Sequence, residues 1–279
     1  MSDQGDHRSG DEERGLEMVG AGAEAFGAIT GGTVGTVGGP VGIVLGGVAG
    51  VAAARMFKFL GGEISKRKLS PAEEIRIGGA AAVAAIEIGS RQDEGEKLRN
   101  DGFFDPANGS RSDSDEVLEG ILLQAAQSYE EKKVPYLGHL YAGIAFDSSI
   151  SPAYAHVMIR MFDRLTYREL AILQYFSDKS GATDRVALGV GIEEGDFTPS
   201  IVLLGEGNRL GEERLLGNRH ADGTVYALVD TNAGGIKGEL FGTITPTQIG
   251  EDFIRLTKLS EIPASDLDDV ARGFKGEIQ

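Results

Sequence analysis

The chain has 279 residues, a length that allows one or two domains. Its net charge of -16 at pH 7 argues against binding of nucleic-acid phosphates as the main activity. The absence of Cys excludes disulfides, thiolate nucleophiles and zinc–thiolate sites, and the four His are too scattered to predict a metal site.

Residues 1–24 carry seven acidic residues against two Arg. They lack the basic flank and the cleavage site of a signal peptide. Their composition predicts a disordered acidic arm.

The next stretch, residues 25–54, contains ten Gly and no charged residue. In water each Gly costs a helix about 1 kcal/mol relative to Ala, whereas in a bilayer a face of small residues lets two helices approach closely. The pattern therefore predicts a membrane-type glycine-zipper helix that self-associates. Its proposed contact residues are Gly27, Gly31, Gly35, Gly38, Gly42, Gly46 and Gly50.

This stretch could cross a bilayer once, or could form a hairpin that turns at Gly38-Gly39-Pro40. A glycine zipper in the core of a soluble all-α protein and a flexible Gly-rich linker are the alternatives. A basic cluster follows the run and predicts that the C-terminal body stays on the cytoplasmic side of the membrane; without insertion the protein would be cytoplasmic. The cluster consists of Arg55, Lys58, Lys66, Arg67 and Lys68.

Several helices are predicted between residues 63 and 165. Ser70-Pro71 is a helix start, and that helix should run to about Leu98. Ser112 or Ser114 should cap a second helix, which Glu130 to Lys133 should close. Residues 136–146 and a segment that starts at Ser151-Pro152 should form two more. These elements predict a helical domain.

The region 166–279 mixes helices with strands. A capping box from Thr166 to Glu169 opens one helix, and short helices are expected near 201–204 and 210–216. Strands at 224–229 and 239–244 would form a small wing, and a closing helix should start at Thr245-Pro246. This order predicts a winged-helix-like module in a chain that is mainly α.

The charge of this module decides between two kinds of partner. A winged helix that reads DNA needs a basic recognition helix. Here three Arg stand against three Glu, so a protein partner is favoured over nucleic acid. These residues are Arg209, Arg214, Arg219, Glu206, Glu212 and Glu213.

Three features together resemble uncharacterised bacterial glycine-zipper proteins near the abortive-infection alpha group. They are the Gly-rich N-terminal segment, Leu165-Thr-Tyr-Arg-Glu-Leu170, and Thr245-Pro-Thr-Gln-Ile-Gly250. The resemblance implies a bacterial origin, so that the predicted membrane would be the bacterial inner membrane, and a role in phage defence. No catalytic residues come with it.

The sequence lacks the motifs of several common enzyme classes. The chain contains no Walker motif, no His-Glu-x-x-His and no Gly-x-Ser-x-Gly. Residues 105–116 have the length of a calcium-binding EF-hand loop but lack its ligands, and Gly20 to Ala25 imitates a dinucleotide fingerprint without a preceding buried strand. The sequence therefore predicts no enzyme, no cofactor and no metal.

Two functional hypotheses follow. The first is a non-enzymatic membrane effector that binds lipid, forms homo-oligomers and permeabilises the membrane in anti-phage defence. The alternative is a soluble oligomeric adaptor or scaffold whose winged-helix-like module binds protein. The predicted regions are 1–24, an acidic arm; 25–62, the glycine-zipper segment; 63–165, a helical domain; and 166–279, the winged-helix-like module.

Overall fold

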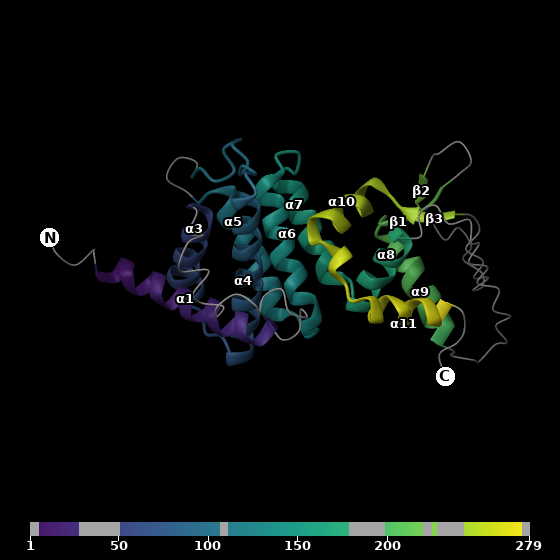
Figure 1. The fold of residues 1–279 in the computed structure, drawn as a ribbon, viewed down its shortest axis with the longest axis horizontal. Coiled ribbons are helices and arrows are strands. Elements are labelled where there is room, and N and C mark those ends of the chain that lie inside the picture. Colours follow the sequence, from purple (N-terminus) through teal and green to yellow (C-terminus); the bar gives the residue numbers. More distant parts are fainter. Residues whose placement is uncertain are drawn as a thin grey trace. The chain divides into compact units, whose positions relative to one another are not determined.

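The computed structural model shows a mainly helical protein whose contacts divide it into two compact units, Met1–Arg164 and Leu165–Gln279. Figure 1 shows the helices and strands of both units. We call them the N-terminal and the C-terminal unit. The structure describes residues 6–27, 51–106, 111–178, 199–219, 225–227 and 243–274.

The described part of the N-terminal unit is built of helices. Its elements are α1 (Asp6–Gly27), α3 (Val51–Phe59), the π-helical turn η1 (Leu60–Ile64), α4 (Pro71–Asp93), α5 (Asp113–Gln127), the 3-10 turn η2 (Glu131–Lys133), α6 (Val134–Phe146) and α7 (Pro152–Arg164).

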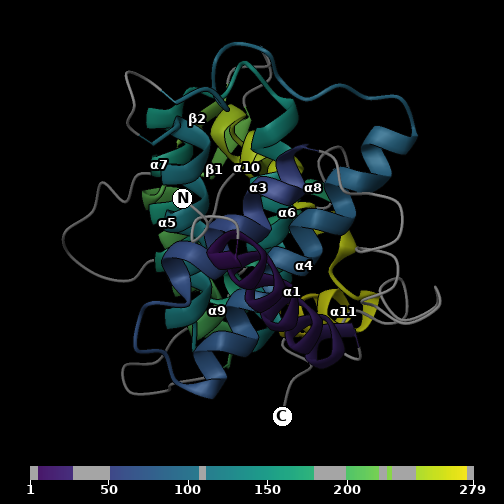
Figure 2. The same ribbon diagram turned by 90° about the vertical axis from the view of Figure 1, so that its left-hand side faces the viewer.

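Helix α4 forms the centre of this unit. Residues 77–85 are all buried, and most of them are Gly or Ala. A helix that is apolar on every side requires neighbours on every side. Helices α1, α3, α5 and α6 all pack against α4, and Figure 2 shows α1 crossing in front of it.

The predicted disordered arm is instead largely helical. Residues 6–24 belong to α1, which buries Met18, Val19 and Phe26 against the unit. Apolar residues spaced by three and four give this helix a core-facing stripe. The acidic composition of the arm had concealed that stripe, because the charged residues lie on the other side and nearer the N-terminus.

The prediction of a membrane effector is wrong. Among the helices in the described parts of the chain, none combines the length and apolar character needed to cross a bilayer. This finding contradicts the predicted membrane-spanning effector and leaves the inner-membrane location without support. The predicted lipid partner stays a prediction. Most of the glycine-zipper run, residues 28–50, lies outside the described residues.

Local capping signals were predicted correctly. Ser70 and Ser112 both form reciprocal capping boxes, with Glu73 and Asp115. In the third box, Thr166 N donates to Glu169 Oε2 over 2.6 Å. Two helix ends were misplaced, since α4 ends at Asp93 and α5 at Gln127. The predicted close of α5, residues 130–133, contributes the separate turn η2.

The C-terminal unit combines helices with a small antiparallel sheet of strand order β2-β1-β3. Strand β1 pairs with both neighbours: Asn218 lies opposite Tyr226 of β2 and Ile244 of β3. The described elements are α8 (Tyr167–Asp178), α9 (Pro199–Glu212), β1 (Leu216–Arg219), β2 (Val225–Ala227), β3 (Thr243–Pro246), α10 (Gln248–Thr257), the 3-10 turn η3 (Leu259–Glu261) and α11 (Ala264–Phe274).

The structure corrects the predicted order of elements in this unit. The two short helices expected near 201–204 and 210–216 are one helix, α9, and Leu216 begins β1. The described sheet has three strands where two were predicted. The closing helix starts two residues later than expected, because Pro246 ends β3 and Thr247 caps α10.

Candidate functional site

The predicted self-association residues fall mostly outside the described part of the chain. Gly27 is the last residue of α1. The structure says nothing about Gly31, Gly35, Gly38, Gly42, Gly46 and Gly50, so their role as contacts between copies stays a prediction.

The basic residues predicted to flank a membrane are described, and two of them bind the protein itself. Arg55 donates to the Phe104 carbonyl, and Arg67 pairs with Glu119. Arg111 reaches the same carboxylate over 2.6 Å. These contacts tie α3 and the segment after η1 to α5 and the chain before it. The remaining members, Lys58, Lys66 and Lys68, are exposed.

Close packing of small residues does occur in the described structure, but between helices of one chain. A Cβ added at Gly22 of α1 would overlap the backbone of Gly78 and Gly79 on α4. A Cβ at Gly15 would overlap the Phe57 carbonyl and approach Gly61 N to 3.3 Å. Only Gly permits this backbone approach. We call the surface that receives α1 the α1 seat; it is formed by Phe57, Gly61, Gly78 and Gly79.

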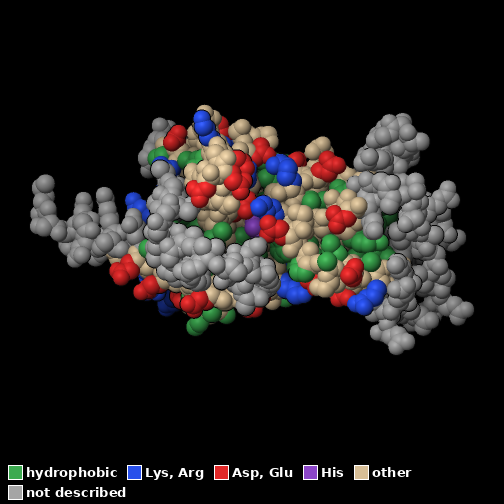
Figure 3. All heavy atoms as spheres, viewed as in Figure 1, with side chains coloured by type: hydrophobic (Ala, Val, Ile, Leu, Met, Phe, Trp, Pro, Cys, Tyr) green, Lys and Arg blue, Asp and Glu red, His purple; other side chains and the backbone are tan. Residues whose placement is uncertain are grey.

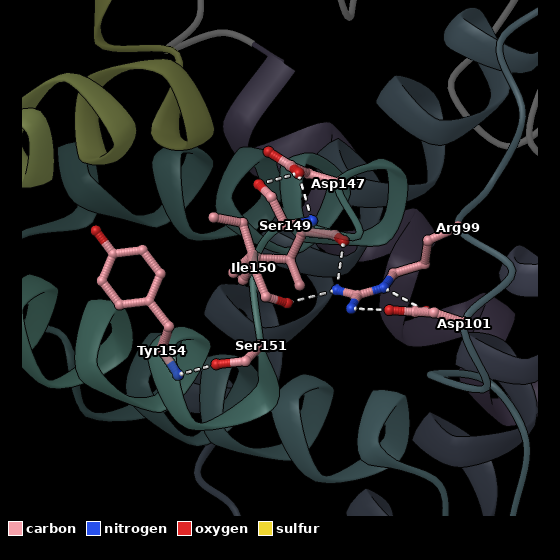
Figure 4. Close-up of polar contacts among 8 residues, drawn as sticks. Arg99, Asp101, Asp147, Ser149, Ile150, Ser151 and Tyr154 are labelled. Atoms are coloured by element: carbon pink, nitrogen blue, oxygen red, sulfur yellow. Dashed lines mark hydrogen bonds and ion pairs between the residues drawn. The ribbon is translucent and has the colours of Figure 1, made fainter.

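A buried arginine, Arg99, binds the C-terminal end of α6. Figure 4 shows its contacts. The side chain of Arg99 is 2% exposed and donates from Nη1 to the carbonyl oxygens of Ile144 and Ile150, over 3.3 and 2.8 Å. It also binds both carboxylate oxygens of Asp101, and this hydrogen bonding lowers the pKa of Asp101. Arg99 therefore caps the end of α6 and holds the turn into α7.

A second buried polar pair joins α5 to α6. The hydroxyls of Ser114 and Tyr141 lie 2.8 Å apart, and burial raises the pKa of Tyr141 to about 12. The Ser114 hydroxyl opposes this rise because it can donate a hydrogen bond to the tyrosinate form. These two buried hydroxyls tie α5 to α6 inside the unit.

The histidines of α6 and α7 lie apart from one another and from any cluster of acids that the described residues form. His139 lies on α6 beside Glu87 of α4, with 3.9 Å between Nδ1 and Oε2, and His156 is exposed on α7. Among the described residues, no three or more His, Cys, Asp or Glu side chains are placed to hold one ion.

The C-terminal unit carries a network of charges between α8 and α9. Arg168 of α8 donates from Nε and Nη2 to Glu206 Oε1 of α9, over 2.9 and 2.7 Å. Arg209 of α9 lies 3.5 Å from Glu169 Oε1 of α8, and Glu169 is buried. Burial, and then repulsion from Glu169, raise the pKa of Glu206, while Arg168 opposes the rise.

One face of α9 is open to solvent. Four exposed residues of α9 are spaced by three and four positions, which places them within about 80° of one another around the helix. Val202 is 43% exposed, which is unusual for a large apolar side chain in the described structure. We call this surface the α9 face; it consists of Val202, Gly205, Arg209 and Glu212. Sequence reasoning missed it because it divided α9 into two helices, which broke the spacing.

Comparison of the chain with protein-family models, with curated proteins and with solved structures gives no match. The resemblance to the abortive-infection alpha group therefore stays a prediction.

Proposed function

We propose that the chain is an adaptor that binds a protein partner through the α9 face of a winged-helix-like C-terminal unit. The arrangement of α8 and α9, the β1–β2 hairpin that follows α9, and the closing helix α10 support this description of the unit. Strands β2 and β3 overlap the two strands of the wing that was predicted from the sequence, and β1 lies between them as an additional strand.

The pairing of the arginines on α8 and α9 carries the proposal. A surface that binds nucleic acid needs cationic side chains directed at phosphates. Arg168 and Arg209 are about half exposed, yet each is matched by a carboxylate of the adjacent helix. In Figure 3, Lys and Arg side chains are likewise scattered among acidic ones on the face that is drawn.

The α9 face suits a helix of a partner protein. Val202 offers an apolar anchor, and the space beside Gly205 is open, since a Cβ added there meets no atom within 4 Å. Arg209 and Glu212 supply charges of both signs at the end of the face. An amphipathic helix with one apolar anchor and complementary charges would match this surface.

The test compares two exposed apolar residues on different units. Full-length wild type, Val202→Asp and the matched control Ile75→Asp, whose parent residue is 37% exposed on α4, would serve as bait in quantitative proximity labelling. We expect a defined partner set that wild type and Ile75→Asp share and that Val202→Asp loses by at least about tenfold, because burying a Val contributes about 1.5–3 kcal/mol. Circular dichroism would check that all three fold.

Two results would contradict the proposal. The first is an identical partner set for all three baits. The second is binding of a duplex DNA probe at physiological salt that Arg209→Glu abolishes, which would make α9 a nucleic-acid-binding helix.

A further inference from the structure

The α1 seat selects a particular kind of helix. Gly15 and Gly22 are seven residues apart on α1, and each lies where a side chain would overlap backbone of the seat. Between and beyond them, Met18, Val19, Ala23 and Phe26 are at most 7% exposed. The seat therefore accepts a helix with Gly two turns apart on an apolar face.

Apolar packing holds α1 in this seat. The ion pair between Arg14 and Glu74 spans 4.0 Å, and both side chains are substantially exposed, so it adds little stability. Other helices of the unit are tied by bonds to main-chain carbonyls. Arg76 donates to Ala126 O over 2.6 Å, and Lys133 donates to Phe162 O over 3.0 Å.

The connection to α3 is long enough to let α1 reach elsewhere. Residues 28–50 separate the two helices. A chain of that length can bridge at most ~80 Å, at roughly 3.5 Å per residue.

We propose that the α1 helix of one copy occupies the α1 seat of a second copy, so that two chains exchange their first helices. The occupant is the α1 helix, which the seat already fits. Its contacts with the seat of a second copy are the same as those it makes with the seat of its own chain. Exchange of an identical element is a route to dimers that requires no new interface. This inference concerns the N-terminal unit and does not depend on the α9 face.

Concentration sets how much exchange occurs. A tethered α1 experiences an effective concentration on the order of mM. Dimers with exchanged helices should therefore increase as the protein concentration rises toward that value. An α1 helix would fill the α1 seat both in the monomer and in the dimer.

Thiol crosslinking tests the exchange directly, because the chain contains no Cys. One full-length chain carries Arg14→Cys, another carries Glu74→Cys, and the two are mixed before a short bismaleimide is added. A chain with both substitutions confirms that the reagent spans the pair in cis. The control mixture pairs Gln124→Cys with Asp163→Cys, two side chains 2.7 Å apart on α5 and α7.

We expect a covalent heterodimer in the α1 mixture that grows with protein concentration from 10 to several hundred μM, roughly toward the effective concentration of the tether. The control mixture should give none. Adding Gly22→Leu to the Arg14→Cys chain should remove the heterodimer, whereas Gly205→Leu should leave it unchanged.

Three results would overturn the proposal. They are no heterodimer at any concentration although the doubly substituted chain reacts in cis, equal heterodimer in the control mixture, and a heterodimer that persists with Gly22→Leu. The first pair of chains contains no change in the packed face of α1, so the test stands even if the Gly22→Leu chain fails to fold.

Discussion

Gly138 of α6 lies directly against the Ala80 carbonyl of α4: a Cβ at Gly138 would come within 2.5 Å of that oxygen and 2.7 Å of the Val83 Cβ. The small residues of α4 thus allow close approach on two sides, to α1 through Gly78 and Gly79 and to α6 through Gly138. Gly lowers helix propensity by about 1 kcal/mol, but closely packed backbones gain dispersion contacts.

Gly138→Ala should destabilise the protein. The added methyl forces α6 away from α4, and overpacking of this kind costs about 1–3 kcal/mol, which outweighs the gain in helix propensity. Urea unfolding followed by circular dichroism would measure the change. Gly205→Ala is the matched control, since a Cβ there meets no atom within 4 Å and should stabilise its helix by up to about 1 kcal/mol. If both variants shift stability in the same direction, the close approach at Gly138 does not matter.

Arg99→Met should lower the free energy of unfolding by about 1–3 kcal/mol, because it leaves the carbonyl oxygens of Ile144 and Ile150 without their charged donor in a buried setting. Arg91→Met is the comparison. Its pair with Glu96 is partly exposed, and pairs of that kind contribute about 0–1 kcal/mol. Equal losses in the two variants would show that Arg99 acts only as a surface charge.

Tyr141→Phe should also destabilise the protein, by about 1–3 kcal/mol, since the buried Ser114 hydroxyl loses its partner. The double variant Tyr141→Phe with Ser114→Ala should recover part of that loss. A double-mutant cycle in urea measures the coupling energy between the two residues. If the effects of the two substitutions are additive, the hydrogen bond between Ser114 and Tyr141 does not contribute to stability.

The same tyrosine predicts a loss of stability at alkaline pH. Its pKa is raised to about 12 in the folded state, against about 10 for an unperturbed Tyr. Above about pH 10 the unfolded chain releases this proton more readily than the folded one, so stability falls as pH rises. The free energy of unfolding should therefore fall more between pH 9 and pH 11 for wild type than for Tyr141→Phe. Parallel curves would contradict the assignment.

Glu206 predicts an effect of the same sign at lower pH. Because burial raises its pKa in the folded state, the folded protein holds this proton more tightly than the unfolded chain. Its contribution to stability is present below the unfolded pKa and is lost as pH rises through the folded pKa. The free energy of unfolding of wild type and of Glu206→Gln would be measured from pH 4 to pH 8. Relative to the variant, wild type should become less stable as pH rises. A difference that does not change with pH would show that the carboxylate is not perturbed.

Features that depend on adjacent residues were predictable from the sequence. The capping boxes at Ser70, Ser112 and Thr166 arise from a hydroxyl and a carboxylate three residues apart, and no distant contact is needed to form them. The mainly helical class followed from such signals and from apolar spacing.

Features that depend on distant contacts were not predictable. Helix α1 was taken for a disordered arm because its acids mask the apolar stripe that α4 covers. The short apolar run at Leu215-Leu216 fits a helix or a strand equally, and pairing with β3 decides for the strand. A pattern of small residues indicates that another backbone comes close, but it does not say whether that backbone belongs to the same chain.

The central position of α4 also governs the order in which the N-terminal unit can form during synthesis. Its neighbours come from both directions along the chain, α1 and α3 before it and α5 and α6 after it. A ribosome that has released α4 has therefore produced a helix of Gly and Ala whose later partners are still missing. Burial of α4 must wait for α6, which ends at Phe146. A nascent chain that has not yet exposed Phe146 outside the ribosome should remain open to protease, whereas one that has exposed all of α7 should be protected.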